Sequence, residues 1–212
     1  MSIEKAYDAW AAQYDTDRNR TRDLDAVSTT ATLSNYSFQR VLELGCGTGK
    51  NTEWLLNRAE RIIGLDFSQA MLDIAKEKVA NNRAQFIKAD LTSEWNIDDQ
   101  WADLVTSSLT LEHIRDLDHI FKQTSRTLTQ NGLFFISELH PYKQYGGSGA
   151  HFNLEDETVH IEVFTHHLTD YIDSGHANGF ELLETREWFD DQTSREIPRL
   201  ISFLFRKKDP AR

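Results

Sequence analysis

Three glycines alternate with other residues in the segment VLELGCGTGK, where Gly45, Gly47 and Gly49 follow a short apolar run. Glycine-rich turns after a strand let the backbone approach a ligand closely. A P-loop needs four residues between its glycines and then Lys-Ser or Lys-Thr, and a dinucleotide site needs G-x-G-x-x-G. Here Lys50 precedes Asn51 and the third glycine comes one residue early. The spacing therefore excludes a P-loop and weakens the dinucleotide interpretation without excluding it.

Two acids end later apolar runs and suggest a different ligand. Asp66 follows the glycine loop at the spacing of an acid that binds ribose hydroxyls. Asp90 ends the next run, where a carboxylate can accept a hydrogen bond from the exocyclic amine of adenine. A single acid of this kind is as often a helix N-cap. Two of them in register with a glycine loop favour a nucleoside site.

The elements that must position these residues alternate along the chain. Residues 1–36 are polar and predicted helical, with Tyr7, Trp10 and Tyr14 on one helix face. This face either packs on the main domain or covers a site. Strands are predicted at 40–45, 61–66, 84–90, 101–108 and 133–139, and helices at 50–59, 68–82, 116–132 and 168–179. Two closing strands, 180–189 and 200–208, are predicted to pair antiparallel at the sheet edge.

Apolar strands that alternate with helices predict a parallel sheet covered on both faces. Ligands of such sheets bind at the carboxyl ends of the strands, near the point where the strand order reverses. The glycine loop, both acids and the segment SSLTLEH all belong at that edge. The irregular segment after Pro141 is predicted to be a loop or short-strand insertion.

The segments VLELGCGTGKNT, IIGLDFSQAMLDIAK, FIKADL and DLVTSSLTLEHI resemble successive motifs of class I S-adenosylmethionine-dependent methyltransferases. The segment FTHHLTDYIDSGHANGFELLE is similar to the late helix-strand unit of the small-molecule, UbiE/BioC-like branch. The resemblance implies an α/β, Rossmann-like methyltransferase fold: a seven-stranded, mostly parallel sheet with an antiparallel last strand and helices on both faces. It also implies a helical cap over 1–36 and a methyltransferase domain over 37–212, with a substrate-covering insertion at about 140–168.

The same resemblance implies S-adenosylmethionine as cofactor and a set of residues around it. Glu43 and the glycines would surround the methionine moiety, Asp66 the ribose and Asp90 the adenine amine. Tyr14 matches a Tyr-Asp element that closes over the cofactor, although Tyr7-Asp8 is a second match. The full set is Tyr14, Glu43, Gly45, Cys46, Gly47, Gly49, Asp66, Phe67, Met71, Asp90, Leu91, Ser107 and Ser108.

The acceptor is predicted to be a small molecule, with oxygen or carbon as the methylated atom. Relatives that methylate adenine or glutamine amides carry an Asn/Asp-Pro-Pro-aromatic tetrad after the fourth strand, and SSLTLEHI stands there instead. The net charge of -11 also argues against a nucleic-acid partner. The remaining alternatives are a protein that binds the cofactor without catalysis and an NAD-linked oxidoreductase.

Histidine is the residue type best suited to act as a general base at neutral pH. His166 and His113 are the catalytic candidates, and the residues expected at the acceptor site are His140, Tyr142, Tyr145 and Phe152. His160, Glu162 and His166 have the even spacing of one strand face, which would permit a three-ligand metal site. No second cluster completes such a site, so no metal is predicted.

The remaining composition sets broad limits. Cys46 is the single cysteine, which weakly favours a reducing compartment. No signal-peptide pattern and no run of about 18 apolar residues occurs, so we predict a cytoplasmic protein without a membrane span. A monomer or homodimer is expected.

Overall fold

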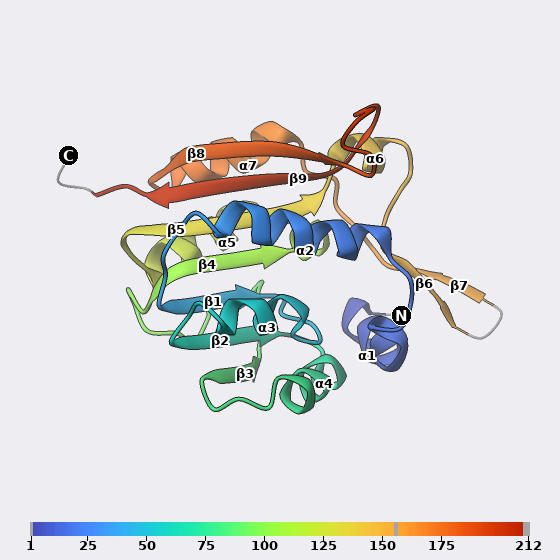
Figure 1. Ribbon diagram of the computed structural model, residues 1–212, viewed down its shortest axis with the longest axis horizontal. Helices are drawn as coiled ribbons and strands as arrows, with labels where there is room; N and C mark the ends of the chain where they lie inside the picture. The colour runs from blue at the N-terminus through green and yellow to red at the C-terminus, as the bar shows by residue number, and fades with distance from the viewer. Residues whose placement is uncertain (1, 155–156, 210–212) are drawn as a thin grey trace.

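A computed structural model of the chain describes residues 2–154 and 157–209, without the side chains of residues 152–154 and 157. Its centre is a seven-stranded sheet in the order β3-β2-β1-β4-β5-β9-β8 (Figure 1). Strands β1 to β5 run parallel, and β9 is antiparallel to both of its neighbours. The strands are β1 Arg40–Leu44, β2 Arg61–Asp66, β3 Ala84–Lys88, β4 Ala102–Ser108, β5 Leu128–Leu139, β8 Phe180–Phe189 and β9 Pro198–Lys207.

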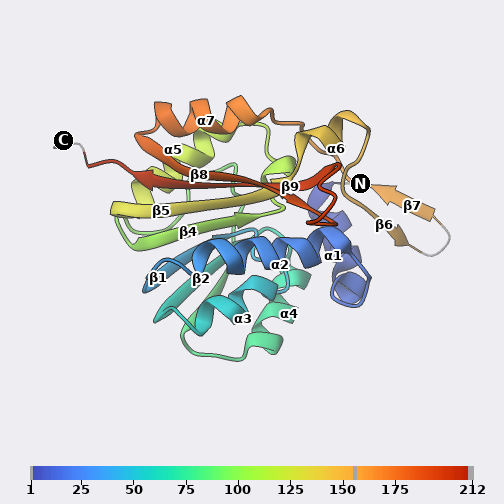
Figure 2. The ribbon, with the colours of Figure 1, turned by 45° about the horizontal axis from the view of Figure 1, so that its top comes forward.

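Helices cover both faces of the sheet (Figure 2). One face carries α2 (Arg20–Leu33), α3 (Lys50–Leu56) and α4 (Gln69–Val79), and the other carries α5 (Leu117–Thr127) and α7 (Leu168–Ala177). Beyond the carboxyl ends of β1 and β4 lies α1 (Ile3–Tyr14), beside a hairpin of β6 (His151–Leu154) and β7 (Glu157–His160) (Figure 1). The 3₁₀ turn η1 (Leu111–His113) and the short α6 (Pro141–Tyr145) complete the described elements.

The strands alternate between two hydrophobic clusters, one on each face of the sheet. On β5, Phe134 packs with Phe121 of α5, and the neighbouring Phe135 belongs to the opposite cluster with Leu33 of α2. Successive side chains of a strand point to opposite faces, so a central strand covered on both sides is apolar throughout. This explains the continuous apolar runs in the sequence and confirms the predicted Rossmann-like architecture.

The predicted helix 116–132 was wrong at its carboxyl end. The helix stops at Thr127, and Leu128 adopts extended backbone and pairs with Ala102 at the start of β5. A register shift then precedes the pairing of Leu104 with Leu133, and Asn131 adopts a positive φ of 62° inside this irregular stretch. The Asn131-Gly132 pair was predicted to stop the helix, but it lies within β5 and marks a distortion of that strand.

Two further elements differ from the sequence expectation. The insertion contains α6, whose Pro141 occupies the first turn and whose N-cap His140 accepts a hydrogen bond from the Tyr142 N–H. The closing strands do pair antiparallel, but β9 lies between β5 and β8, so that β8 alone forms the edge. The segment 1–36 holds two helices with different positions, because α2 packs on the sheet and α1 lies past its end.

Candidate methyltransferase site

The glycine loop joins β1 to α3 through three residues in the left-handed region. Gly45, Gly47 and Gly49 have φ angles of 66°, 52° and 77°. The backbone N–H of Gly45 donates to the Leu65 carbonyl at 2.8 Å, which holds the loop against the end of β2. A side chain at Gly45 would meet Thr110 Oγ1 at 2.1 Å, whereas a side chain at Gly47 would meet nothing within 4 Å. The loop is therefore packed on one side and open at Gly47.

Asp66 at the end of β2 organises this loop. One carboxylate oxygen accepts from the Gly47 N–H and the other from the Ser68 N–H, each at 2.9 Å. The side chain is buried, and desolvation raises its pKa to about 6 despite these backbone donors. Each carboxylate oxygen has a second lone pair, so Asp66 can also accept hydrogen bonds from a ligand.

A first cavity of about 570 Å³ opens beside the glycine loop at the carboxyl ends of the strands. Its lining joins the Asp66 and Asp90 carboxylates to apolar side chains and glycine backbone. This mixture fits a nucleoside joined to an amino acid, because the acids suit hydroxyl and amine donors and the apolar surfaces suit a base. The lining of this cavity includes nine residues of the predicted cofactor set: Tyr14, Gly45, Gly47, Asp66, Phe67, Met71, Asp90, Leu91 and Ser108.

Four other residues of that set do not line the cavity. Glu43 is buried behind the loop, where the Thr52 hydroxyl donates to it at 2.5 Å and desolvation raises its pKa to about 7. Cys46 is buried against Gly64, Gly49 begins α3, and Ser107 is buried within the sheet. These four residues therefore belong to the glycine loop or to the packing behind it, and not to the cavity surface.

Hydrogen bonds and ion pairs hold α1 beside the first cavity. Asp8 accepts from the Ser68 hydroxyl at 2.6 Å and from the Ala70 N–H at 3.3 Å, at the start of α4. Exposed ion pairs join Glu4 to Lys88 and Asp15 to Lys78, each at 2.8 Å. The aromatic face predicted from the sequence points inward, so that Tyr7 lies 5.7 Å from the Phe67 ring, centroid to centroid.

His113 is the one predicted catalytic histidine that lines the first cavity. Its Nδ1 lies 2.9 Å from the Glu162 carbonyl, and its Nε2 lies 2.8 Å from the Tyr7 hydroxyl. A carbonyl can only accept, so Nδ1 carries the proton and Nε2 accepts from Tyr7. Burial lowers the pKa of His113 and so disfavours the imidazolium form, while the Glu162 carbonyl holds the proton on Nδ1.

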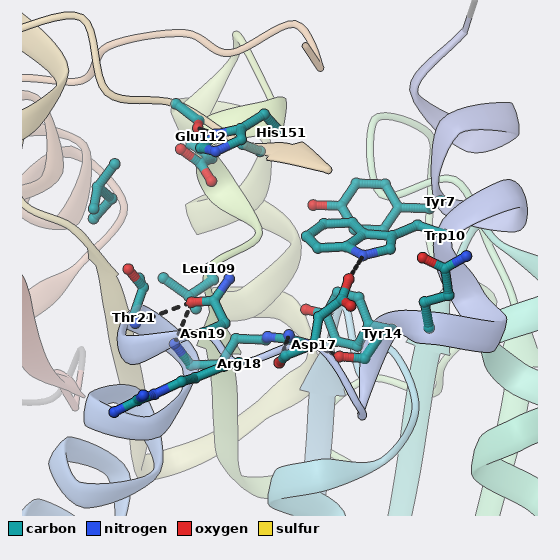
Figure 3. Close-up of a pocket in the computed structure, with 15 residues that line it drawn as sticks. Tyr7, Trp10, Tyr14, Asp17, Arg18, Asn19, Thr21, Leu109, Glu112 and His151 are labelled. Carbon is teal, nitrogen blue, oxygen red and sulfur yellow. Dashed lines mark hydrogen bonds between the residues drawn. The ribbon is translucent and has the colours of Figure 1, made fainter. Parts of the chain in front are cut away.

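A second cavity of about 370 Å³ is lined by α1 and by the segment that follows it (Figure 3). Tyr7, Tyr14 and Leu109 line both cavities and form the boundary between them. Figure 3 shows Glu112 and His151 on one side of the second cavity, and Arg18, Asn19 and Thr21 on the opposite side. Trp10 adds an aromatic wall, and its indole N–H donates to Asp17 at 2.9 Å.

The other residues predicted at the acceptor site lie elsewhere. His166 is buried, donates to the Ile114 carbonyl at 2.8 Å and packs edge-on against Tyr171. His140 caps α6 and lies 3.2 Å from Glu187, while Tyr142 and Tyr145 are exposed. Phe152 is on β6, and its side chain lies outside the described residues. Within residues 2–154 and 157–209, no three His, Cys, Asp or Glu side chains gather as metal ligands would.

Sequence reasoning missed Glu112, Arg18 and Arg22 in the second cavity. Glu112 had a signal, because it stands beside His113 in the motif that ends β4. The arginines had none, since charged residues near a helix start normally indicate a solvated surface. Arg22 is instead buried, with its guanidinium over the Tyr14 ring at 4.1 Å.

The strand order, the glycine loop and the acids at the strand ends define a Rossmann-like methyltransferase fold. Residues 42–136 match the family model described as "Methyltransferase domain". An S-adenosylmethionine-dependent methyltransferase from Listeria monocytogenes, described as putative, has a TM-score of 0.72 at 21% identity, covering 88% of this chain and all of that one. A DhpI–SAH complex has a TM-score of 0.71 at 20% identity, covering 97% of each chain. These structural likenesses show the fold.

Among curated proteins, an uncharacterized methyltransferase from Schizosaccharomyces pombe is 28% identical over 73% of this chain and 56% of its own length. The chain spans about half the length of several curated relatives that it matches. The family match covers residues 42–136, and the fold is the one found in S-adenosylmethionine-dependent methyltransferases. Across the described residues, every helix is too short or too polar to cross a lipid bilayer.

Proposed function

We propose that this protein transfers the methyl group of S-adenosylmethionine to a small molecule and releases S-adenosylhomocysteine. The observation that carries the proposal is the meeting of the two cavities at Tyr7, Tyr14 and Leu109. One cavity has the lining expected around a nucleoside, and the other has a lining of mixed polarity. A donor site and an acceptor site that share a wall are what a direct transfer requires.

The residues of the first cavity divide into three groups along the cofactor. We assign the ribose hydroxyls to Asp66, the adenine amine to Asp90, and the faces of the base to Phe67, Met71 and Leu91. The methionine end belongs beside Gly45, Gly47 and Ser108. Tyr7 and Tyr14 then cover the reacting end, which gives both Tyr-Asp matches in the N-terminal segment a place at the boundary.

Bound S-adenosylmethionine supplies a methyl group that its sulfonium already activates. The protein has to align the acceptor with that methyl group and to exclude water, and the rings carried by α1 can do both. For a hydroxyl acceptor, the Tyr7 hydroxyl can receive the acceptor proton as it passes its own to His113 Nε2, to which it is already hydrogen-bonded. This gives the histidine predicted from the sequence a role through Tyr7.

The cover of the acceptor site comes from two separate segments. α1 and the loop that follows it supply Tyr7, Trp10, Gln13 and Arg18, and the insertion supplies Gly149, Ala150 and His151. This arrangement supports the proposed organisation, with a helical cap at the amino terminus and an acceptor-covering insertion at about 140–168. Tyr142 and Tyr145 are exposed and do not line the second cavity.

Calorimetry with S-adenosylhomocysteine and a screen for its release test the proposal. We expect binding by the wild-type protein, and acceptor-dependent product release from at least one small-molecule panel. Binding without release across broad panels would favour a protein that holds the cofactor without catalysis. Binding of NAD in place of S-adenosylhomocysteine would favour the oxidoreductase alternative, which the glycine spacing already opposes.

A further inference from the structure

The second cavity holds a buried cation without a carboxylate partner. Arg22 is 8% exposed, and its guanidinium donates to the main-chain carbonyls of Tyr14 and of Asp17, the latter at 2.8 Å. Neither Arg22 nor Arg18 takes part in any of the ion pairs found among the described residues. A guanidinium has five N–H donors, so these contacts leave Arg22 able to bind an anion.

The same cavity holds a buried acid without a strong cationic partner. Glu112 is 6% exposed, and it accepts from Gln144 Nε2 at a long 3.3 Å. The nearest basic group is His113, at 3.9 Å, which is neutral in its hydrogen-bonded tautomer. Burial raises the pKa of Glu112 to about 7. The other titratable groups around it are Glu138, Tyr7, Tyr171 and His151.

These groups lie at different depths relative to the methyl donor. Glu112 belongs to the short segment whose Thr110, His113 and Ile114 line the first cavity. Arg18 and Arg22 line only the second cavity. Glu112 is therefore beside the first cavity, where methyl transfer would occur. Arg22 packs on Tyr14 at the boundary between the cavities, and Arg18 lies across the second cavity from Glu112. Figure 3 shows Glu112 and Arg18 on opposite sides of the space between them.

We propose that the acceptor is a small amino acid, with its carboxylate bound by Arg18 and Arg22 and its amine bound and deprotonated by Glu112. The proposal rests on the proposed function and names its substrate class. Carboxylates pair well with guanidinium groups, and amines pair well with a carboxylate. A volume of about 370 Å³ is at the lower end for ligand sites, which suits a small acceptor.

The chemistry of this assignment places the methyl group on nitrogen. The bound ammonium group first passes one proton to the Glu112 carboxylate. The freed lone pair then forms the new nitrogen–carbon bond as the carbon–sulfur bond breaks, and the electron pair of that bond stays on sulfur. The methylated product leaves as an ammonium cation, and Glu112 later releases its proton to water. The acceptor atom then differs from the oxygen or carbon expected from the sequence.

Release of S-adenosylhomocysteine from three matched panels tests this assignment. The panels are free amino acids, the hydroxy acids with the same side chains, and the same amines without the carboxyl group. We expect turnover of one or more amino acids, with kcat/KM lower by about 10- to 100-fold or more for both analogues. Equal turnover of an analogue, or no turnover of any amino acid by protein that binds S-adenosylhomocysteine, would overturn the assignment.

Two variants test the roles of the charged residues. Arg18→Ala should raise KM for the amino acid about 10-fold or more and leave kcat nearly unchanged, because it loses only a binding contact. The matched control is Arg20→Ala, since Arg20 is an exposed neighbour outside the cavity lining. Equal KM values for both variants would contradict the role of Arg18.

Glu112→Gln should lower kcat and remove the rise of the rate with pH that deprotonation of Glu112 causes near neutrality. A pH profile unchanged from the wild type would contradict its role as the base. Calorimetry on the same samples separates the two levels of the proposal. If the wild-type protein does not bind S-adenosylhomocysteine, the proposed function itself is refuted. If it binds S-adenosylhomocysteine but methylates another class of acceptor, only the amino-acid assignment is refuted.

Discussion

The Tyr7 hydroxyl and His113 Nε2 are joined by a hydrogen bond of 2.8 Å, although 106 positions separate the two residues in the sequence. The bond links the helix that covers the site to the turn that follows β4. It also lies at the boundary between the two cavities, because Tyr7 lines both. The position of α1 and the protonation of His113 are therefore coupled.

Tyr7→Phe should loosen α1 without removing its aromatic packing. The variant leaves His113 Nε2 without its donor and should lower the free energy of unfolding by about 0.5–1.5 kcal/mol. Hydrogen exchange of the α1 amides should become faster, and chemical denaturation gives the stability change. Tyr142→Phe is the control, because Tyr142 is exposed. Equal exchange rates in both variants would show that the bond does not hold α1.

Asp66→Ala should weaken S-adenosylhomocysteine binding by about 1–3 kcal/mol, because the ribose hydroxyls lose a charged acceptor. The Gly47 and Ser68 N–H groups also lose their partner, so the loop should become less ordered. Calorimetry measures the affinity, with Asp73→Ala as a control on the exposed face of α4. An unchanged dissociation constant would mean that another acid binds the ribose.

Gly45→Ala should be much more harmful than Gly47→Ala. Both positions have positive φ, which costs about 1–2 kcal/mol for an L-residue. Only at Gly45 does the new methyl group also meet Thr110, at 2.1 Å. Thermal unfolding of the two variants compares these costs directly. Similar melting temperatures would contradict the tight packing of the loop against Thr110.

Glu138→Gln should change how stability depends on pH. Glu138 is fully enclosed, and desolvation raises its pKa from 4.5 to about 8. The native state therefore binds this proton more tightly than the unfolded state, and stability falls as the pH rises from about 4.5 to about 8. Glu43 and Glu112, with pKa values of about 7, act in the same direction.

The glutamine cannot ionise, so the variant should gain at least about 1 kcal/mol relative to wild type between pH 5 and pH 9. Urea denaturation across that range measures the difference. A stability difference that stays constant with pH would show that Glu138 titrates as it does in the unfolded chain.

Most of the sheet could be predicted because its signals are local. The apolar runs, the left-handed glycines and the acids at strand ends each depend on a few neighbouring residues. The end of α5 could not be predicted in this way, because pairing of Leu128 with Ala102 decides it. The position of His166 could not be predicted either, because sequence alone does not distinguish a buried histidine bonded to the Ile114 carbonyl from a histidine in an active site.

The sequence by itself determined the donor side of this protein. Glycine spacing and the positions of Asp66 and Asp90 follow from backbone geometry at the carboxyl ends of parallel strands, so they predict a nucleoside site before the tertiary structure is known. Only the tertiary structure showed the second cavity, where we propose that the acceptor binds. Glu112 and Arg22 are far apart in the chain, and they line one cavity because α1 and the start of α2 lie near the carboxyl ends of the strands. Contacts of that kind depend on packing between distant segments, which no local pattern records.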